Sequence, residues 1–286
     1  MSDVLVTATE LRDALAAGGF ADGGPVRVLD VRWRLGRPNG LPEYRAGHIP
    51  GAQYVDLDHE LAAHGEPTDG RHPLPPVEAL QEAARRWGID DGDTVVVYDD
   101  LKNLSSARAW WLLRYAGVAD VRLLDGSLRA WTDAGFDAET GDATPPAPGS
   151  VTLAYGALPV LPLDEVAGFA DGALLLDARA GERYRGEVEP IDPRAGHVPG
   201  AVSAPTTENV GADGRFLAPE ALRARFTELG ALPGVEVGVY CGSGVTAAHQ
   251  AVALTLAGFT PRVFPGSWSQ WSNHPELPVA TGAEPR

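Results

Sequence analysis

A single thiol, Cys241, is the residue of this 286-residue chain best suited to covalent chemistry. The apolar run 235–240 before it predicts a buried strand, and the stretch 246–257, followed by Gly258, predicts a helix. Backbone N–H groups converge where a strand turns into a helix, and the helix dipole adds partial positive charge there. An anionic sulfur is stabilised in such surroundings, so Cys241 is the candidate nucleophile.

The loop that Cys241 opens, residues 241–246, fits three chemistries. A dinucleotide loop, G-x-G-x-x-A, matches residues 242–247, but no acidic residue for the ribose occurs between Thr246 and Pro275. A cysteine phosphatase needs an arginine to clasp the phosphoryl oxygens, and alanines stand where it would be, at 247 and 248. Sulfur transfer needs N–H donors around a persulfide and no bulky cation in the loop. The residues therefore favour sulfur transfer.

Four landmarks occur twice along the chain in the same order, which predicts a duplicated domain, since each recurs roughly 140–150 residues later. They are a strand ending in Asp-x-Arg (30–32 and 177–179), a Gly-His-x-Pro-Gly segment (47–51 and 196–200), a buried strand ending in Tyr (94–98 and 235–240), and Gly-Ser-x-x-x-Trp (126–131 and 266–271). Asp99 follows Tyr98 as Cys241 follows Tyr240, so only the second half can carry out thiol chemistry.

Each half alternates buried strands with helices, a pattern typical of an α/β fold with a mostly parallel sheet and helices on both faces. We expect a non-catalytic domain at 1–140, with Asp99 in place of cysteine, a Pro-rich linker at 141–156 and a catalytic domain at 157–286. In such folds the functional crevice lies at the carboxyl ends of the strands, where Cys241 is placed.

The composition limits the partners. The net charge of −16 opposes binding to nucleic acid and to anionic membrane surfaces, and an anionic substrate would need a local cationic pocket. No apolar run reaches the ~18 residues of a membrane span, and no signal-peptide pattern opens the chain, so a cytoplasmic location is expected. One cysteine and scattered histidines lack the spacing of a metal site, and no cofactor is expected.

Taken together, these motifs resemble those of the two-domain rhodanese-type sulfurtransferases, over nearly the whole chain. The resemblance rests on the loop 241–247, both Gly-His-x-Pro-Gly segments, Asp99 in place of cysteine, and both Gly-Ser-x-x-x-Trp segments. It implies two similar rhodanese-like α/β domains, with the catalytic loop in the second and the active site between the two.

The loop is similar to the Cys-Gly-Ser/Thr-Gly-Val-Thr of members that use 3-mercaptopyruvate, whereas members that use thiosulfate carry basic side chains there. The resemblance thus implies that sulfur moves from 3-mercaptopyruvate, or from thiosulfate, through a Cys241 persulfide. The acceptor would be cyanide, a small thiol or a thioredoxin-like protein. Two alternatives stay open: thiosulfate:cyanide transfer as the main activity, and a persulfide relay or binding module without turnover.

The resemblance also assigns roles to single residues. Ser243, His72 and Asp58 would relay protons, although the segment between Asp58 and His72 is a few residues longer than the mercaptopyruvate pattern. Arg183 would bind the anionic group of the sulfur donor. The position nine residues on, where those enzymes carry a second arginine, is Asp192 here, so Arg194 is the nearest candidate.

Backbone groups complete the predicted site. The N–H groups of the loop would hold the anionic sulfur and the substrate. The two histidines of the Gly-His-x-Pro-Gly segments, His48 and His197, are expected to be structural, since they also occur in the half that has no thiol. The predicted binding residues of the loop are Gly242, Gly244, Val245 and Thr246.

Overall fold

The computed structural model describes residues 4–21 and 23–285, and the chain divides into two compact units. The segment that the sequence marks as a linker, 141–156, lies within unit 1. Unit 1 consists of the chain up to Ala63, Pro75–Ala157 and Ala212–Arg215, and unit 2 consists of His64–Leu74, Leu158–Gly211 and Phe216–Arg286. A short segment from the first half of the sequence, His64–Leu74, is therefore part of the second unit.

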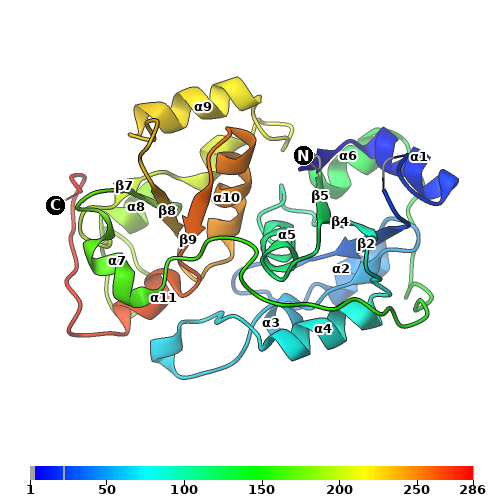
Figure 1. The fold of residues 1–286 in the computed structure, drawn as a ribbon, viewed down its shortest axis with the longest axis horizontal. Coiled ribbons are helices and arrows are strands. Elements are labelled where there is room, and N and C mark those ends of the chain that lie inside the picture. Colours follow the sequence, from blue (N-terminus) through cyan, green and yellow to red (C-terminus); the bar gives the residue numbers. More distant parts are fainter. Residues whose placement is uncertain (1–3, 22, 286) are drawn as a thin grey trace. The chain divides into compact units, whose positions relative to one another are not determined.

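Unit 1 is built on a parallel sheet whose five described strands lie in the order β1-β5-β4-β2-β3 (Figure 1). Its strands are β1 (Leu5–Val6), β2 (Val26–Asp30), β3 (Gln53–Tyr54), β4 (Thr94–Tyr98) and β5 (Asp120–Leu124). Its helices are α1 (Ala8–Ala17), α2 (Leu41–Ala46), α3 (Leu57–Glu60), α4 (Val77–Arg86), α5 (Ser106–Tyr115) and α6 (Ser127–Asp133).

Unit 2 repeats this plan with a parallel sheet whose described strands lie in the order β7-β6-β8-β9. A single parallel bridge, Val160 to Val263, stands where unit 1 has β1. Its strands are β6 (Leu174–Asp177), β7 (Val202–Ser203), β8 (Val237–Tyr240) and β9 (Pro261–Val263). Its helices are α7 (Leu163–Phe169), α8 (Gly181–Tyr184), α9 (Pro219–Glu228), α10 (Thr246–Leu256) and α11 (Ser267–Ser272), with 3₁₀ turns η1 (Pro67–Asp69) and η2 (Thr206–Asn209).

Successive side chains of a strand point to opposite faces of the sheet. Both faces of each sheet therefore present side chains, and helices pack on both. In unit 1, Val96 and Tyr98 of β4 pack in one cluster with residues of α1 and α6, while α5 packs against β4 and β5. In unit 2, Tyr240 of β8 packs in one cluster with residues of α7 and α11, while α10 lies along β8 and β9 (Figure 1). The predicted α/β fold, a tandem pair of parallel sheets, is confirmed.

The repeated Asp-x-Arg and Gly-His-x-Pro-Gly segments prove to be parts of one structural clamp. In unit 2, Arg179 Nη2 donates to Asp177 Oδ2 at 2.6 Å and to the carbonyl of Gly196 at 2.6 Å. His197 is fully buried, stacks on Tyr184 and contacts the Tyr184 carbonyl through Nδ1 at 2.8 Å. Unit 1 repeats every one of these contacts with Asp30, Arg32, Gly47, His48 and Tyr44. Both histidines are therefore structural.

Candidate active site in unit 2

The thiol of Cys241 lies at the carboxyl end of β8, where the sequence places it. Cys241 is 1% exposed, and its Sγ accepts a hydrogen bond from the N–H of Gly244 at 3.2 Å. Gly244 adopts φ +78, a left-handed conformation that glycine takes without strain. This turn curls the loop around the sulfur, so that a backbone donor faces it.

Hydrogen bonds from α11 to two carbonyl groups of the loop hold the loop in place. The carbonyls of Cys241 and Gly242 accept from the N–H groups of Trp268 and Ser269, at 2.9 and 2.8 Å, in the first turn of α11. On the other side α10 begins at Thr246, and its N-cap residue, Val245, supplies no side-chain hydrogen bond to the first turn. Because no cap occupies them, the N–H groups at the start of α10 are suited to an anionic group on the sulfur.

Ser267 is a residue of the site that no sequence-based prediction named. Its Oγ accepts the N–H of Cys241 at 3.1 Å, donates to the carbonyl of Phe264 at 2.9 Å, and lies 4.0 Å from Sγ. Its φ of +55 is unusual for a residue with a side chain. Ser127 in unit 1 has the same conformation, φ +60. The recurrence of Gly-Ser-x-x-x-Trp in both halves was the signal that could have revealed it.

In unit 1, the loop that corresponds to 241–246 binds the carboxylate of Asp99. This carboxylate is fully buried, and Oδ1 accepts from the N–H groups of Leu101 and Asn103 at 2.7 and 2.8 Å. Oδ2 accepts from the N–H groups of Ser105 and Ser106 at 2.8 and 3.0 Å. Burial raises the pKa of Asp99, whereas these four backbone donors work in the opposite direction. The duplicated loop is thus an anion cradle that holds its own side chain.

The three residues of the predicted relay fall in different parts of the structure. Ser243, 5% exposed, and His72, 8% exposed, both belong to unit 2. Asp58 belongs to unit 1, where its Oδ1 accepts from Trp33 Nε1 at 2.7 Å. The structure places two of the three in one unit, and the relay stays a prediction.

Two arginines border the catalytic loop at Gly242. A Cβ atom on residue 242 would lie 3.1 Å from Nη2 of Arg71 and 3.3 Å from Nη1 of Arg183, so glycine here leaves room for two guanidinium groups. Arg183 donates to Glu189 at 2.7 Å and to Asp192 at 3.3 Å. Arg71 forms an ion pair with Asp192 as well. The sequence motifs point to Arg183 but give no role to Arg71.

Comparison with protein families identifies the chain. The family model of the rhodanese-like domain matches residues 7–134 and 164–274. The chain belongs to this family. A relative named as the thiosulfate sulfurtransferase SseB of Mycobacterium tuberculosis is 48% identical over 98% of this chain and 97% of its own. A Pseudomonas aeruginosa relative named as a 3-mercaptopyruvate sulfurtransferase is 46% identical over 89% of this chain and 92% of its own.

Solved structures agree with this assignment. The crystal structure of SseA from Escherichia coli, a 3-mercaptopyruvate sulfotransferase with the rhodanese fold, matches with a TM-score of 0.81 and 32% identity. The match covers 93% of this chain and 99% of that one. The chain is thus a rhodanese-like sulfurtransferase with two rhodanese-like domains.

In this sulfurtransferase Arg194 is held by backbone groups. Its guanidinium donates to the carbonyls of Trp271, Ser272, His274 and Leu277 at 2.7–2.9 Å. These bonds support a structural part for Arg194 in fixing the end of α11. Its predicted contact with the sulfur donor stays a prediction.

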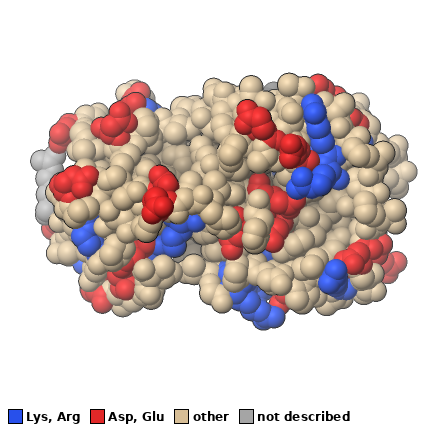
Figure 2. Space-filling model, turned by 90° about the horizontal axis from the view of Figure 1, so that it is seen from below, with Lys and Arg blue, Asp and Glu red and all other residues tan. Residues whose placement is uncertain are grey.

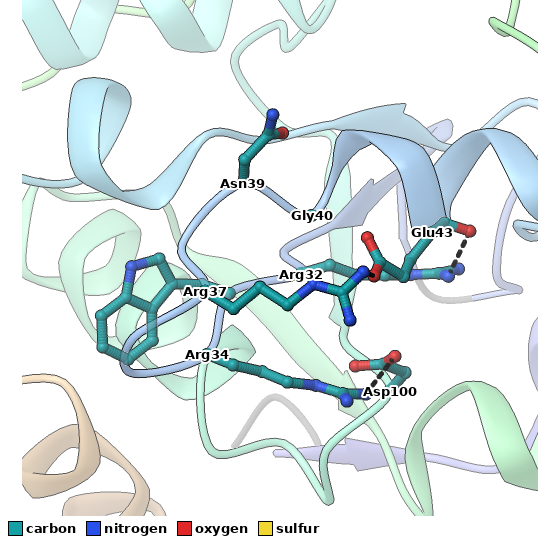
Figure 3. A pocket seen from close by; sticks show the side chains of 8 residues that line it. Arg32, Arg34, Arg37, Asn39, Gly40, Glu43 and Asp100 are labelled. Atoms are coloured by element: carbon teal, nitrogen blue, oxygen red, sulfur yellow. Dashed lines mark hydrogen bonds and ion pairs between the residues drawn. The ribbon is translucent and has the colours of Figure 1, made fainter.

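A hollow in unit 1 also gathers arginines, after the strand β2 (Figure 3). Arg34 and Arg37 lie over it, Arg34 paired with Asp100 at 2.7 Å and Arg37 paired with Glu43. Each of these cations already has a carboxylate partner, and the residue next to Asp100 is the caged Asp99. Carboxylate pairing of the arginines is thus common to this hollow and to Arg71 and Arg183 of unit 2, whereas the thiol is present in unit 2 alone.

Neither a metal-binding cluster nor a membrane-spanning helix occurs in the described part of the chain, 4–21 and 23–285. It contains no group of three or more His, Cys, Asp or Glu side chains placed to hold a metal ion. None of its helices combines the length and apolar character needed to cross a lipid bilayer.

Proposed function

We propose that this sulfurtransferase takes sulfur from 3-mercaptopyruvate onto Cys241 and passes it to a thiophilic acceptor. The observation that carries the proposal is the pair of matching loops. One loop cages the carboxylate of Asp99 with four backbone N–H groups, and the other holds Cys241 with the Gly244 N–H on its sulfur. A cradle built for an anion, opened by a nucleophile, suits a persulfide.

In the first half-reaction the Cys241 thiolate attacks the sulfur atom of mercaptopyruvate and the carbon–sulfur bond breaks. The bonding electrons leave with the carbon as the enolate of pyruvate, and the proton of the sulfur donor's thiol ends on that carbon. The products are pyruvate and Cys241–S–S⁻. The N–H groups of residues 242–246 stabilise the terminal sulfur, and Arg183 binds the carboxylate of the sulfur donor.

Ser243 and His72 handle the proton in this proposal, with Asp58 orienting the histidine. Ser243 sits inside the loop and His72 follows Arg71, which borders the same loop at Gly242. These positions suit a hydroxyl–imidazole relay to the departing carbon.

In the second half-reaction an acceptor attacks the outer sulfur and the sulfur–sulfur bond breaks toward Cys241. Cyanide yields thiocyanate and regenerates the thiolate, while a thiol or a thioredoxin-like dithiol carries the sulfur away as a persulfide. The cytoplasmic location expected from the sequence stays a prediction.

Thiosulfate is the second candidate sulfur donor, because the relative that is 48% identical is named as a thiosulfate sulfurtransferase. Attack on its outer sulfur gives the same persulfide and releases sulfite. The loop 241–246 itself carries no Lys or Arg for the second charge of this dianion. We therefore propose 3-mercaptopyruvate as the better of the two.

Mass spectrometry and turnover test this proposal together. After incubation with 3-mercaptopyruvate, intact protein should gain about 32 Da, one sulfur atom, on Cys241, and pyruvate should be released. The ratio of kcat/KM for the two sulfur donors, measured in one preparation, ranks them. Cys241→Ser should lose both the added mass and turnover.

Two results would contradict the proposal. Turnover retained by Cys241→Ser would remove the thiol from the mechanism. Stable loading of Cys241 without catalytic transfer to cyanide or a thiol would favour the alternative of a relay module that only hands sulfur to a partner.

A further inference from the structure

We propose that Arg71 is a second binding residue for the anionic group of the sulfur donor, and that Asp192 positions it. This inference rests on the proposed function and adds a residue from the segment His64–Leu74, which is part of unit 2. The sequence gives Arg71 no motif, so its place at the loop emerges only from the fold.

The segment that carries Arg71 is fastened to α11 and the residues around it. The N–H of Arg71 donates to Ser269 Oγ at 3.0 Å, and His274 Nε2 contacts the Thr68 carbonyl at 3.2 Å. Gly70, at φ +87, lies so close to Gly266 that a Cβ there would be 2.9 Å from its carbonyl oxygen. Because backbone and side-chain contacts fix this segment, the Arg71 side chain leaves it from a defined point.

Asp192 holds the guanidinium of Arg71 through Nη1, whereas Nη2 is the nitrogen nearest Gly242. The Asp192 side chain is only 3% exposed and pairs with Nη1 of Arg71 and with Arg183. Burial raises the pKa of Asp192, while the charge of Arg71 works in the opposite direction. A carboxylate this deeply buried needs its cations, so the contact fixes the side chain of Arg71.

Donor atoms remain for a ligand after these contacts. Arg71 uses Nη1 for Asp192, and Arg183 uses Nε and Nη2 for Glu189 and Asp192. The guanidinium hydrogen bonds found among the described residues leave out the two nitrogens nearest Gly242, Nη2 of Arg71 and Nη1 of Arg183. The Nε of Arg71 is buried and also lacks an acceptor within residues 4–21 and 23–285.

Two guanidinium edges beside the nucleophile match an anion with at least two oxygens in one plane or cluster. A carboxylate or a sulfonate fits this description, and each can accept from both arginines at once. The anionic end of the sulfur donor would then lie beside Gly242, one residue from the attacking sulfur. Arg71 thus acts in binding and orienting the sulfur donor, and not in moving protons.

Steady-state kinetics of Arg71→Gln, Asp192→Asn and a control variant test the proposal. Arg71→Gln should raise KM for mercaptopyruvate about tenfold or more, the usual effect of losing a charged hydrogen bond, with kcat changed less than about threefold. Asp192→Asn keeps the guanidinium but loses its anchor, so a smaller rise in KM is expected. If Arg71→Gln does not fold, Arg71→Lys, which keeps the charge but loses the forked guanidinium, should still raise KM for mercaptopyruvate.

Arg262→Gln is the matched control. Arg262 belongs to unit 2, its side chain is 23% exposed against 25% for Arg71, and it pairs with Glu165 at 2.5 Å. Its contacts are with Val160, Glu165, Glu236 and the ring of Phe169, none of which belongs to the catalytic loop. Its KM and kcat should equal those of the wild type.

Two further measurements separate binding from a general structural effect and from the proposed function. Preloaded Cys241 persulfide should discharge to a neutral thiol at the wild-type rate in Arg71→Gln, since no anionic sulfur donor takes part. Pyruvate, a sulfur-free carboxylate, should bind the wild type and bind Arg71→Gln about tenfold more weakly by calorimetry, whether or not the enzyme turns over.

The role of Arg71 is overturned if pyruvate does not bind the wild type, if Arg71→Gln binds it equally well with an unchanged KM, or if persulfide discharge slows as much as loading. Absence of turnover in the wild type would instead contradict the proposed function.

Discussion

At the residue scale, Ser267 and Ser127 hold the same place in the two halves of the chain. Each adopts a positive φ and directs its hydroxyl at the residue that opens the loop, Cys241 or Asp99. Ser127 donates to Asp99 Oδ1 at 3.1 Å, whereas Ser267 accepts the N–H of Cys241 at 3.1 Å. A serine at this place therefore secures a caged carboxylate in one unit and the proposed nucleophile in the other.

Replacing Ser267 by alanine should lower kcat/KM more than replacing Ser127 by alanine. The buried N–H of Cys241 loses its acceptor, so we expect about 1–3 kcal/mol less stability to urea and roughly a ten- to hundredfold lower kcat/KM. Ser127→Ala is the control, with a comparable loss of stability and unchanged kcat/KM. Equal kcat/KM in both variants would show that Ser267 does not position the nucleophile.

At the element scale, the strand–loop–helix junction occurs in both units, but its backbone donors face different groups in the two. In unit 2, β8, the loop and α10 leave backbone donors around a thiol. In unit 1, β4 and α5 flank a loop whose donors are consumed by Asp99. The element that we propose to be catalytic in one unit holds its own carboxylate in the other, where it acts as a structural lock.

Asp99→Asn should therefore destabilise the fold without touching the chemistry. The amide NH₂ would face two of the four backbone N–H groups, and the loss of those bonds should cost roughly 2–4 kcal/mol of unfolding free energy. Asp100→Asn is the neighbouring control, because its pair with Arg34 is partly exposed, at 22% and 46% for the two side chains, and contributes about 1 kcal/mol or less. A urea midpoint for Asp99→Asn no lower than that of Asp100→Asn would disprove the lock.

At the scale of the whole molecule, the excess of acidic residues repels every anionic sulfur donor. The net charge is −16, and the face drawn in Figure 2 shows acidic and basic side chains interspersed. Exposed charges are screened by salt, whereas partly buried guanidinium groups such as those of Arg71 and Arg183 are screened much less. Salt should thus weaken the repulsion between the acidic protein and an anionic sulfur donor more than the attraction of that donor to Arg71 and Arg183.

Raising the ionic strength from about 10 to about 150 mM should increase kcat/KM for anionic sulfur donors. The increase should be steeper for thiosulfate, a dianion, than for 3-mercaptopyruvate, a monoanion. Discharge of the persulfide to a neutral thiol serves as the reference and should not change. A fall of kcat/KM with salt for both sulfur donors would show that attraction by the arginines outweighs the net charge.

The sequence by itself determined the duplicated α/β fold and the family, and it predicted the nucleophile, because each is written in short contiguous motifs. Cys241 after a buried strand and Asp99 at the twin position needed no tertiary information. Helix and strand periodicity are local properties, so the alternation of elements in each half was also predictable.

Only the tertiary structure decided which side chains surround Cys241. Arg71 meets Asp192 across 121 residues and Ser269 across 198, contacts that no spacing rule contains. Asp192 gave a partial hint, since a carboxylate stood where a cation was expected, but the compensating cation was far away in the chain. Residues in the catalytic loop itself could be named in advance, whereas Arg71 and Ser267 depend on how distant segments pack.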